Sequence, residues 1–129
     1  MEEIKAEVAA FKVVLKKLDK EFRDGTVKEE FYFKRRISFV REQGLLIQKL
    51  QDHLVAYEAN SLYEVLEQIK QSSDDAVIDQ KLKAAEQEGQ TKGWGRIVAA
   101  LSGDHNISRI EVALEAAFRV ADYLVQGHN

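Results

Sequence analysis

Apolar residues recur along most of the chain at intervals of three and four positions, which is the spacing of a helix that buries one face. An alternation of apolar and polar residues, the pattern of a half-buried strand, never continues beyond four or five positions. The sequence also contains no proline, a residue that interrupts helix interiors and is common in turns. These patterns predict an all-helical chain with short connections.

The first predicted helix covers residues 3–23 and has a regular apolar seam. Its apolar positions are separated by alternating steps of four and three residues, at Ile4, Val8, Phe11, Leu15, Leu18 and Phe22. This heptad pattern is typical of a helix that packs lengthwise against another helix, as in a coiled coil. Gly25 is expected to end the helix, because glycine adopts the left-handed backbone conformation without steric cost.

The stretch from Thr26 to Glu58 predicts one long second helix. Thr26 and Glu29 have the spacing of a capping box, and the short link at residues 24–26 predicts an antiparallel hairpin with the first helix. Gly44 lies in the middle of the long helix. It is equally consistent with a tolerated weak point and with a close crossing of two helices.

Two apolar stripes run along this second helix, whereas a helix with a single packing partner needs only one. One stripe consists of Phe33, Ile37, Val40 and Ile47, and the other of Phe39, Leu46, Leu50 and Leu54. The surplus predicts two packing surfaces, supplied by the rest of the chain, by a second copy or by another protein.

Four shorter helices are predicted in the C-terminal half, over residues 61–71, 75–88, 92–101 and 108–126. Ser61 with Glu64, and Ser108 with Glu111, have capping-box spacing at two of the helix starts. The last helix is rich in alanine, and we expect it to be the most buried of the four. A length of 129 residues favours a single domain, in which residues 1–58 form the hairpin and residues 59–129 pack on the end of its long second helix.

Composition excludes several kinds of function. The chain has no cysteine, which excludes disulfides and thiolate metal sites, and no apolar run long enough to cross a bilayer. Residues 1–58 carry 12 basic and 11 acidic side chains, and residues 59–129 carry 7 and 11. This mild asymmetry argues against attraction of the whole protein to nucleic acid or anionic lipid. We expect a cytoplasmic protein that does not bind membranes.

Candidate catalytic and metal-binding residues are few. His53 beside Asp52 could be a base with an orienting carboxylate, but adjacent charged residues are common on exposed helices, and a surface pair is the favoured interpretation. His105 follows Asp104 in a predicted loop, where solvent exposure is favoured because no nucleophile or phosphate-binding loop lies nearby in the sequence. The pair at residues 74–75 lacks the further oxygen ligands of a calcium loop. The sequence therefore predicts a protein that is not an enzyme, with no catalytic residue, cofactor or metal.

Trp94 is the only tryptophan and lies between two glycines. The favoured interpretation places it in the core, where the flanking glycines allow the backbone to pack closely. The alternative is an exposed anchor for a partner, a role in which tryptophan is enriched.

The surplus of apolar surface and the lack of a chemical site together predict an interaction module, either an adaptor or a small regulatory or assembly subunit. It would bind another protein or a second copy of itself through the hairpin. The candidate partner-binding residues are Phe33, Ile37, Phe39, Val40, Ile47, Leu50, Leu54 and Trp94.

The alternative function is nucleic-acid binding through the basic residues of the hairpin, which could follow a phosphate backbone. The candidates are Lys16, Lys20, Lys34, Arg35, Arg36 and Arg41. Acidic residues are interspersed among them, which favours a solvated helix surface over a phosphate-binding one.

Overall fold

The computed structural model describes residues 2–71, 74–104 and 108–127, apart from the side chains of Phe33, Ile37 and Val40. The prediction of an all-helical chain is confirmed: the described residues form seven helices and no strand. None of these helices is long and apolar enough to cross a bilayer. The helices are α1 (Glu2–Arg23), α2 (Glu29–Glu42), α3 (Gly44–Ala56), α4 (Asn60–Gln71), α5 (Asp75–Lys92), α6 (Gly95–Ser102) and α7 (Arg109–Val125).

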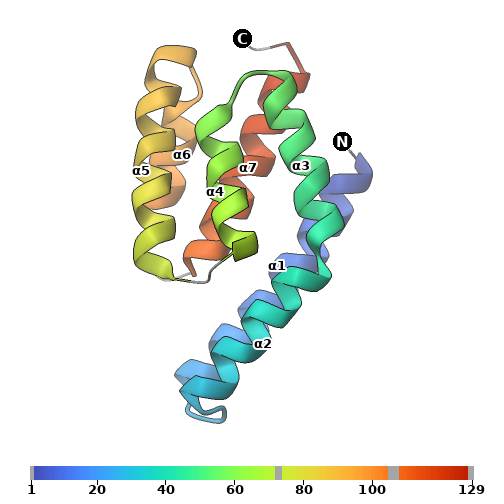
Figure 1. Ribbon diagram of the computed structural model, residues 1–129, viewed down its shortest axis with the longest axis vertical. Coiled ribbons are helices and arrows are strands. Elements are labelled where there is room, and N and C mark those ends of the chain that lie inside the picture. Colours follow the sequence, from blue (N-terminus) through green and yellow to red (C-terminus); the bar gives the residue numbers. More distant parts are fainter. Residues whose placement is uncertain (1, 72–73, 105–107, 128–129) are drawn as a thin grey trace.

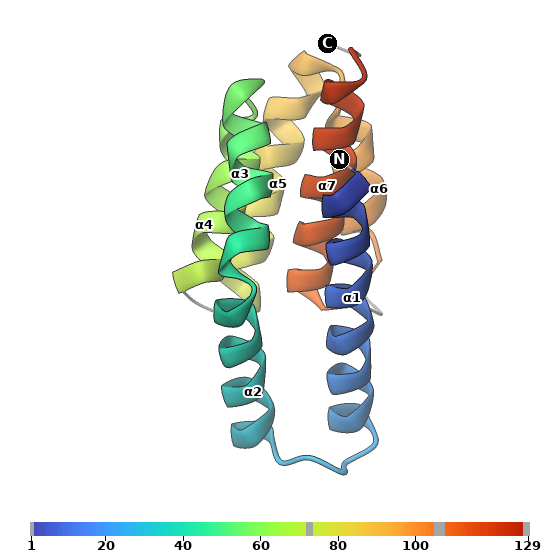
Figure 2. The same cartoon turned by 90° about the vertical axis from the view of Figure 1, so that its right-hand side faces the viewer.

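Helices α1 and α2 lie side by side and extend together beyond the end of a bundle formed by the other helices (Figure 2). Phe11 stacks on Phe39 with the ring centroids 4.9 Å apart, and Phe22 stacks on Tyr32 at 4.4 Å. The residue numbers rise along one helix as they fall along the other, so the two helices run in opposite directions. Offset ring stacking of this kind adds to the energy of apolar burial.

The turn between these helices is built differently from the prediction. Gly25 has a φ of 74° and donates its backbone N–H to the carbonyl of Phe22, while the Thr26 N–H reaches the carbonyl of Glu21. This is the glycine-dependent helix end that the sequence predicted. The Thr26 hydroxyl also donates to the carbonyl of Glu21. Thr26 therefore completes the end of α1, and α2 begins only at Glu29.

The prediction of one long helix over residues 26–58 is wrong. It is interrupted at Gln43, where the backbone has φ −94° and ψ 17°, and α3 begins at Gly44. Figure 1 shows α2 and α3 meeting at an angle. A β-carbon at Gly44 would meet nothing within 4 Å, so no close helix crossing explains this glycine. The interruption lets α3 follow the bundle while α2 stays with α1.

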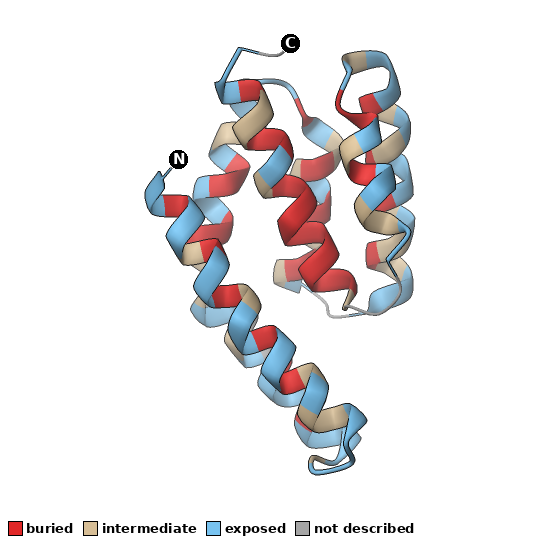
Figure 3. Ribbon diagram, turned by 180° about the vertical axis from the view of Figure 1, so that it is seen from behind, coloured by how far each residue is buried: buried red, intermediate tan, exposed pale blue. Residues whose placement is uncertain are grey.

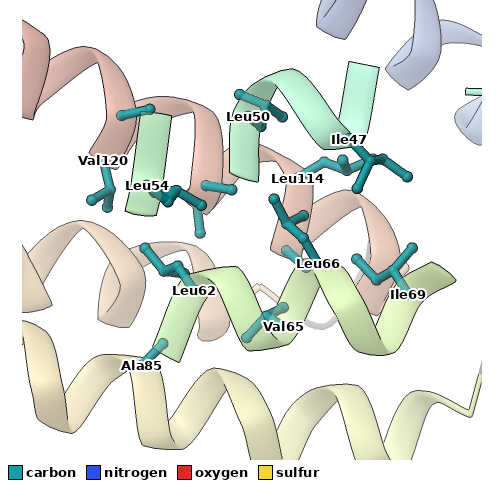
Figure 4. Packing of buried hydrophobic residues seen from close by; sticks show 14 of the residues in the cluster. Ile47, Leu50, Leu54, Leu62, Val65, Leu66, Ile69, Ala85, Leu114 and Val120 are labelled. Carbon is teal, nitrogen blue, oxygen red and sulfur yellow. The ribbon is translucent and has the colours of Figure 1, made fainter. Parts of the chain in front are cut away.

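Helix α7 is the centre of the bundle, and the prediction that it is the most buried C-terminal helix is confirmed. Twelve of its residues are buried, and Figure 3 shows them along almost its whole length. Helices α3 and α4 pack on it, and their side chains meet those of α7 in one apolar cluster (Figure 4). The cluster includes Ile47, Leu50, Leu54, Leu62, Val65, Leu66, Ile69, Leu114 and Val120.

The start of α4 is capped from another helix. The predicted box of Ser61 and Glu64 is wrong, because the Ser61 hydroxyl is buried without a hydrogen-bond partner and the helix begins at Asn60. The carboxylate of Glu88, on α5, accepts the backbone N–H groups of Asn60 and Ser61 at 3.2 and 2.8 Å. A carboxylate at a helix N-terminus satisfies free N–H groups and is favoured by the helix dipole.

Helices α5 and α6 meet at a corner that depends on glycines. The predicted break at residues 88–91 is wrong, since α5 continues through Gly89 to Lys92. The chain turns at Gly93, whose φ is 90°. Trp94 is fully buried, which confirms its favoured placement in the core. A β-carbon added to Gly89 would lie 2.5 Å from the Trp94 ring and 2.6 Å from the Gly95 backbone, so only glycine fits there.

We expect Gly89→Ala to lower the free energy of unfolding by about 1–3 kcal/mol, because the new methyl group overpacks the corner. Gly44→Ala is the matched control: it lies at a helical position with open space around it, and it should leave stability unchanged or raise it by up to about 1 kcal/mol. Urea unfolding followed by circular dichroism measures both. Equal stability of Gly89→Ala and wild type would contradict this account of the corner.

Candidate protein-interaction surface

One side of α1 is joined to the bundle by ion pairs with α7. The Lys12 ammonium donates a hydrogen bond to the Glu115 carboxylate. The Lys16 ammonium lies 3.8 Å from the Glu111 carboxylate. Arg119, one turn after Glu115 on α7, also donates to the Glu115 carboxylate, at 2.7 Å. Two lysines one turn apart on α1 therefore face two glutamates one turn apart on α7.

The two glutamates are both buried but titrate differently. Burial raises the pKa of Glu115, but hydrogen bonds from Lys12 and Arg119 outweigh it, and its net pKa is lower than the ordinary value. Burial also raises the pKa of Glu111, and there the more distant Lys16 does not compensate. The Glu111 Oε2 atom has no hydrogen-bond partner. The charge of Glu115 is thus stabilised in the folded protein, and that of Glu111 is not.

The same side of α2 meets the bundle through a buried arginine. Arg36 is 1% exposed, and its Nη2 atom lies 3.2 Å from the Asp75 carboxylate at the start of α5. Its guanidinium also lies 5.7 Å from the centre of the Tyr32 ring, and the Tyr32 hydroxyl donates to Asp19 of α1. Burial, with this bond to Asp19, raises the pKa of Tyr32 well above its ordinary value. Charged and polar contacts therefore fix the α1–α2 pair to the bundle.

The other side of the pair carries a groove of about 240 Å³ between the two helices. Positions two apart on a helix differ by about 200°, so Val14, between Lys12 and Lys16, points away from α7. We call this side the outer face. Its groove is lined by Val14, Lys17, Leu18 and Glu21 of α1 and by Arg35 and Phe39 of α2.

Exposed apolar side chains extend the outer face beyond this groove. Phe31 is 53% exposed, and the Arg35 guanidinium lies 6.0 Å from the centre of its ring. Leu45, at the start of α3, is 81% exposed. It lies one turn before Lys49, which forms an ion pair across the outer face with Glu7 of α1 at 3.4 Å. The outer face thus combines aliphatic and aromatic side chains with charges of both signs.

The structure divides the predicted partner-binding residues. Ile47, Leu50, Leu54 and Trp94 are each 0% exposed in the chain's own core, because α4, α5 and α7 enclose them. Only Phe39 lines the outer face, where it is half-buried. The side chains of Phe33, Ile37 and Val40 lie outside the described residues. Val14, Leu18 and Phe31 were not predicted, although Val13 and Val14 are apolar positions outside the heptad seam.

The candidate nucleic-acid residues do not form one basic surface. Lys16 faces Glu111, Lys34 lies 3.5 Å from Glu30, and Arg36 is buried against Asp75. Arg35 belongs to the outer face. Lys20 and Arg41 are exposed. Much of the basic character of the hairpin sequence is thus neutralised by the chain's own carboxylates.

The histidine–aspartate pairs considered as catalytic candidates are the last of the predicted sites. His53 is half-buried near the end of α3, and the neighbouring Asp52 accepts a hydrogen bond from Gln48. The backbone carbonyl of Asp104 accepts one from the buried Arg109, whereas His105 and His128 lie outside the described residues. Within the described ranges, no group of three potential metal ligands converges.

Another hollow, of about 650 Å³, lies at the end of the bundle opposite the projecting α1–α2 pair. Its walls include the turn after α3, the α5–α6 corner and the end of α7. The Lys92 ammonium on its edge donates to the carbonyl of Glu58 and to the carboxylate of Glu88. This lysine therefore holds the turn against α5.

We compared the chain with models of known protein families, with curated proteins and with solved structures, and found no match.

The two glutamates of α7 should have opposite effects on stability. Above the ordinary carboxyl pKa, Glu115 contributes stability that is lost as the pH falls through its lowered folded-state pKa. Glu115→Gln should therefore cost about 1–3 kcal/mol at pH 7. Glu111 destabilises the fold while it is charged. Glu111→Gln should be neutral at pH 7 or stabilising by up to about 1 kcal/mol.

Urea unfolding of wild type and both variants between pH 7 and pH 3 measures these effects. The difference between Glu111→Gln and wild type should vanish as the pH falls through the raised pKa of Glu111, and that of Glu115→Gln should persist to lower pH. Equal losses in both variants at pH 7 would contradict the assignment.

Proposed function

We propose that the chain is a non-enzymatic interaction module, an adaptor or a small regulatory or assembly subunit. In this proposal it binds a second protein molecule, either another copy or a different protein, through the outer face of its helical hairpin. The supporting observation is the groove between α1 and α2, which the bundle leaves uncovered and which apolar side chains line. A groove between two helices is suited to receiving the apolar face of another helix.

The charged contacts of the opposite side support the same proposal. Lys12, Lys16 and Arg36 hold the pair against α7 and α5, so the outer face is presented in a fixed orientation. A preorganised surface loses less conformational entropy on binding than a mobile one. Val14, Leu18 and Phe39 line one groove on this face, and a contiguous apolar surface marks interaction sites more often than single exposed residues do.

A charge placed in the groove tests the proposal. Val14→Glu should abolish association, because the carboxylate would have to be buried without a partner. Val125→Glu is the matched control, since Val125 at the end of α7 is 38% exposed and Val14 is 40% exposed. Light scattering over a range of concentrations measures self-association, and affinity capture compares the proteins retained by the two variants.

Circular dichroism should show the same helical content in both variants and wild type. The expected result is association that Val14→Glu loses and Val125→Glu keeps. The proposal would be overturned if the wild-type chain is monomeric at high concentration and captures no protein that the Val14→Glu variant fails to capture.

A further inference from the structure

We infer that the occupant of the outer face is a second copy of this chain, packed about a two-fold axis that runs parallel to α1 and α2. This inference rests on the proposed function and specifies its partner. In this arrangement α1 of each copy lies on α2 of the other, and every helix is antiparallel to its neighbours. The four helices then form a bundle with the two grooves facing each other.

The register of the α1–α2 pair determines which residues meet. Phe11 is level with Phe39, and Phe22 with Tyr32. A two-fold axis parallel to the helices keeps every residue at its own level along the bundle. Val14 lies three residues beyond Phe11, so Val14 of one copy lies within about one turn of Phe39 of the other.

About two turns further along α1, Glu21 of one copy lies near Arg35 of the other. Both side chains line the groove. The dimer interface thus contains apolar contacts between Val14 and Phe39 and two Glu21–Arg35 pairs. The two pairs are related by the two-fold axis and lie on either side of it.

The distribution of charge favours this arrangement over a two-fold packing of α1 on α1 that is centred on Val14. An axis perpendicular to the helices and passing near Val14 would place α1 on α1. Glu7 and Glu21 lie seven positions to either side of Val14, so this packing would bring the acidic side chains of the two copies together. Like charges that face each other across an interface oppose association. The parallel axis instead brings each acidic residue of the groove to a basic one.

The mixed signs of the outer face also favour a second copy over a strongly charged partner. Glu7 and Glu21 are balanced by Lys17, Arg35 and Lys49. A surface with both signs at corresponding levels is complementary to itself under a two-fold rotation, whereas a uniformly acidic or basic surface is not.

Charge reversal in two separate chains tests the pairing. Glu21→Arg alone would place two arginines opposite each other, and Arg35→Glu alone would place two glutamates opposite each other. Each variant by itself should dimerise about tenfold more weakly than wild type. An equimolar mixture of the two should restore association as a mixed dimer, because both contacts then join opposite charges.

Light scattering gives the mass of each variant and of the mixture, and native mass spectrometry distinguishes the mixed dimer if one chain carries a small tag. In the mixture the two reversed charges are on different chains, so recovery has to come from a contact between chains. A double variant with both changes in one chain could recover through a contact within that chain. Circular dichroism checks that each variant is folded, and Lys20→Glu, on an exposed residue outside the groove, serves as the charge-reversal control.

Recovery in the mixture alone supports the inference. A wild-type dimer that Val14→Glu dissociates, but whose charge-reversed variants do not recover when mixed, overturns this packing and leaves the proposed function standing. A strictly monomeric wild type overturns the inference, and the proposed function then depends on capture of a different protein by the same face.

Discussion

The burial of α7 is the constraint on which the rest of the structure depends. Among the described helices, α7 contacts α1, α3, α4, α5 and α6. Packing against five helices requires apolar residues on more than one side of α7. Its alanines at positions 113, 116, 117 and 121 are all fully buried, and small side chains on several sides let several helices approach it. A helix buried on all sides needs few polar residues, yet α7 carries Glu111 and Glu115 in its first half. Their placement determines where α1 can lie.

Buried carboxylates are costly unless opposite charges reach them. Lys12 of α1 meets this need at Glu115 together with Arg119, while Lys16 approaches Glu111 without compensating its burial. The two lysines nevertheless show which side of α1 turns toward the bundle. Phe11 then stacks on Phe39 of α2, and Val14 is left on the far side. The outer face is therefore a consequence of the ion pairs of the inner one.

Local sequence patterns predicted much of this fold, and contacts between distant residues account for what they missed. The heptad spacing and Gly25 gave the first helix and its end correctly, because these signals act within a few residues. Ser61 and Glu64 had the spacing of a cap, but Glu88, 27 positions beyond Ser61, supplies it. At Gly89 the sequence suggested a break, whereas the glycine serves a close approach to Trp94. Of the predicted interaction residues whose side chains are described, Phe39 alone lies on the outer face. The spacing of Leu50 and Leu54 could not show which helices cover them.

The apolar surplus of residues 26–58 has two different explanations along its length. Around α3 the surplus is satisfied within the chain, because Ile47, Leu50 and Leu54 enter the same core as α4 and α7. Around α2 the bundle contributes Asp75, which pairs with the buried Arg36 of α2 on one side. On the other side lies the groove that α1 and α2 line. At about 1.5 Å per residue, the 22 residues of α1 span about 33 Å and the 17 residues of α7 about 25 Å. The bundle is too short to cover the whole pair, and Figure 2 shows the excess length projecting from it. The projecting helices keep their own contact through the stacked Phe22 and Tyr32, and their outer face stays open to a second molecule because the groove lies between α1 and α2.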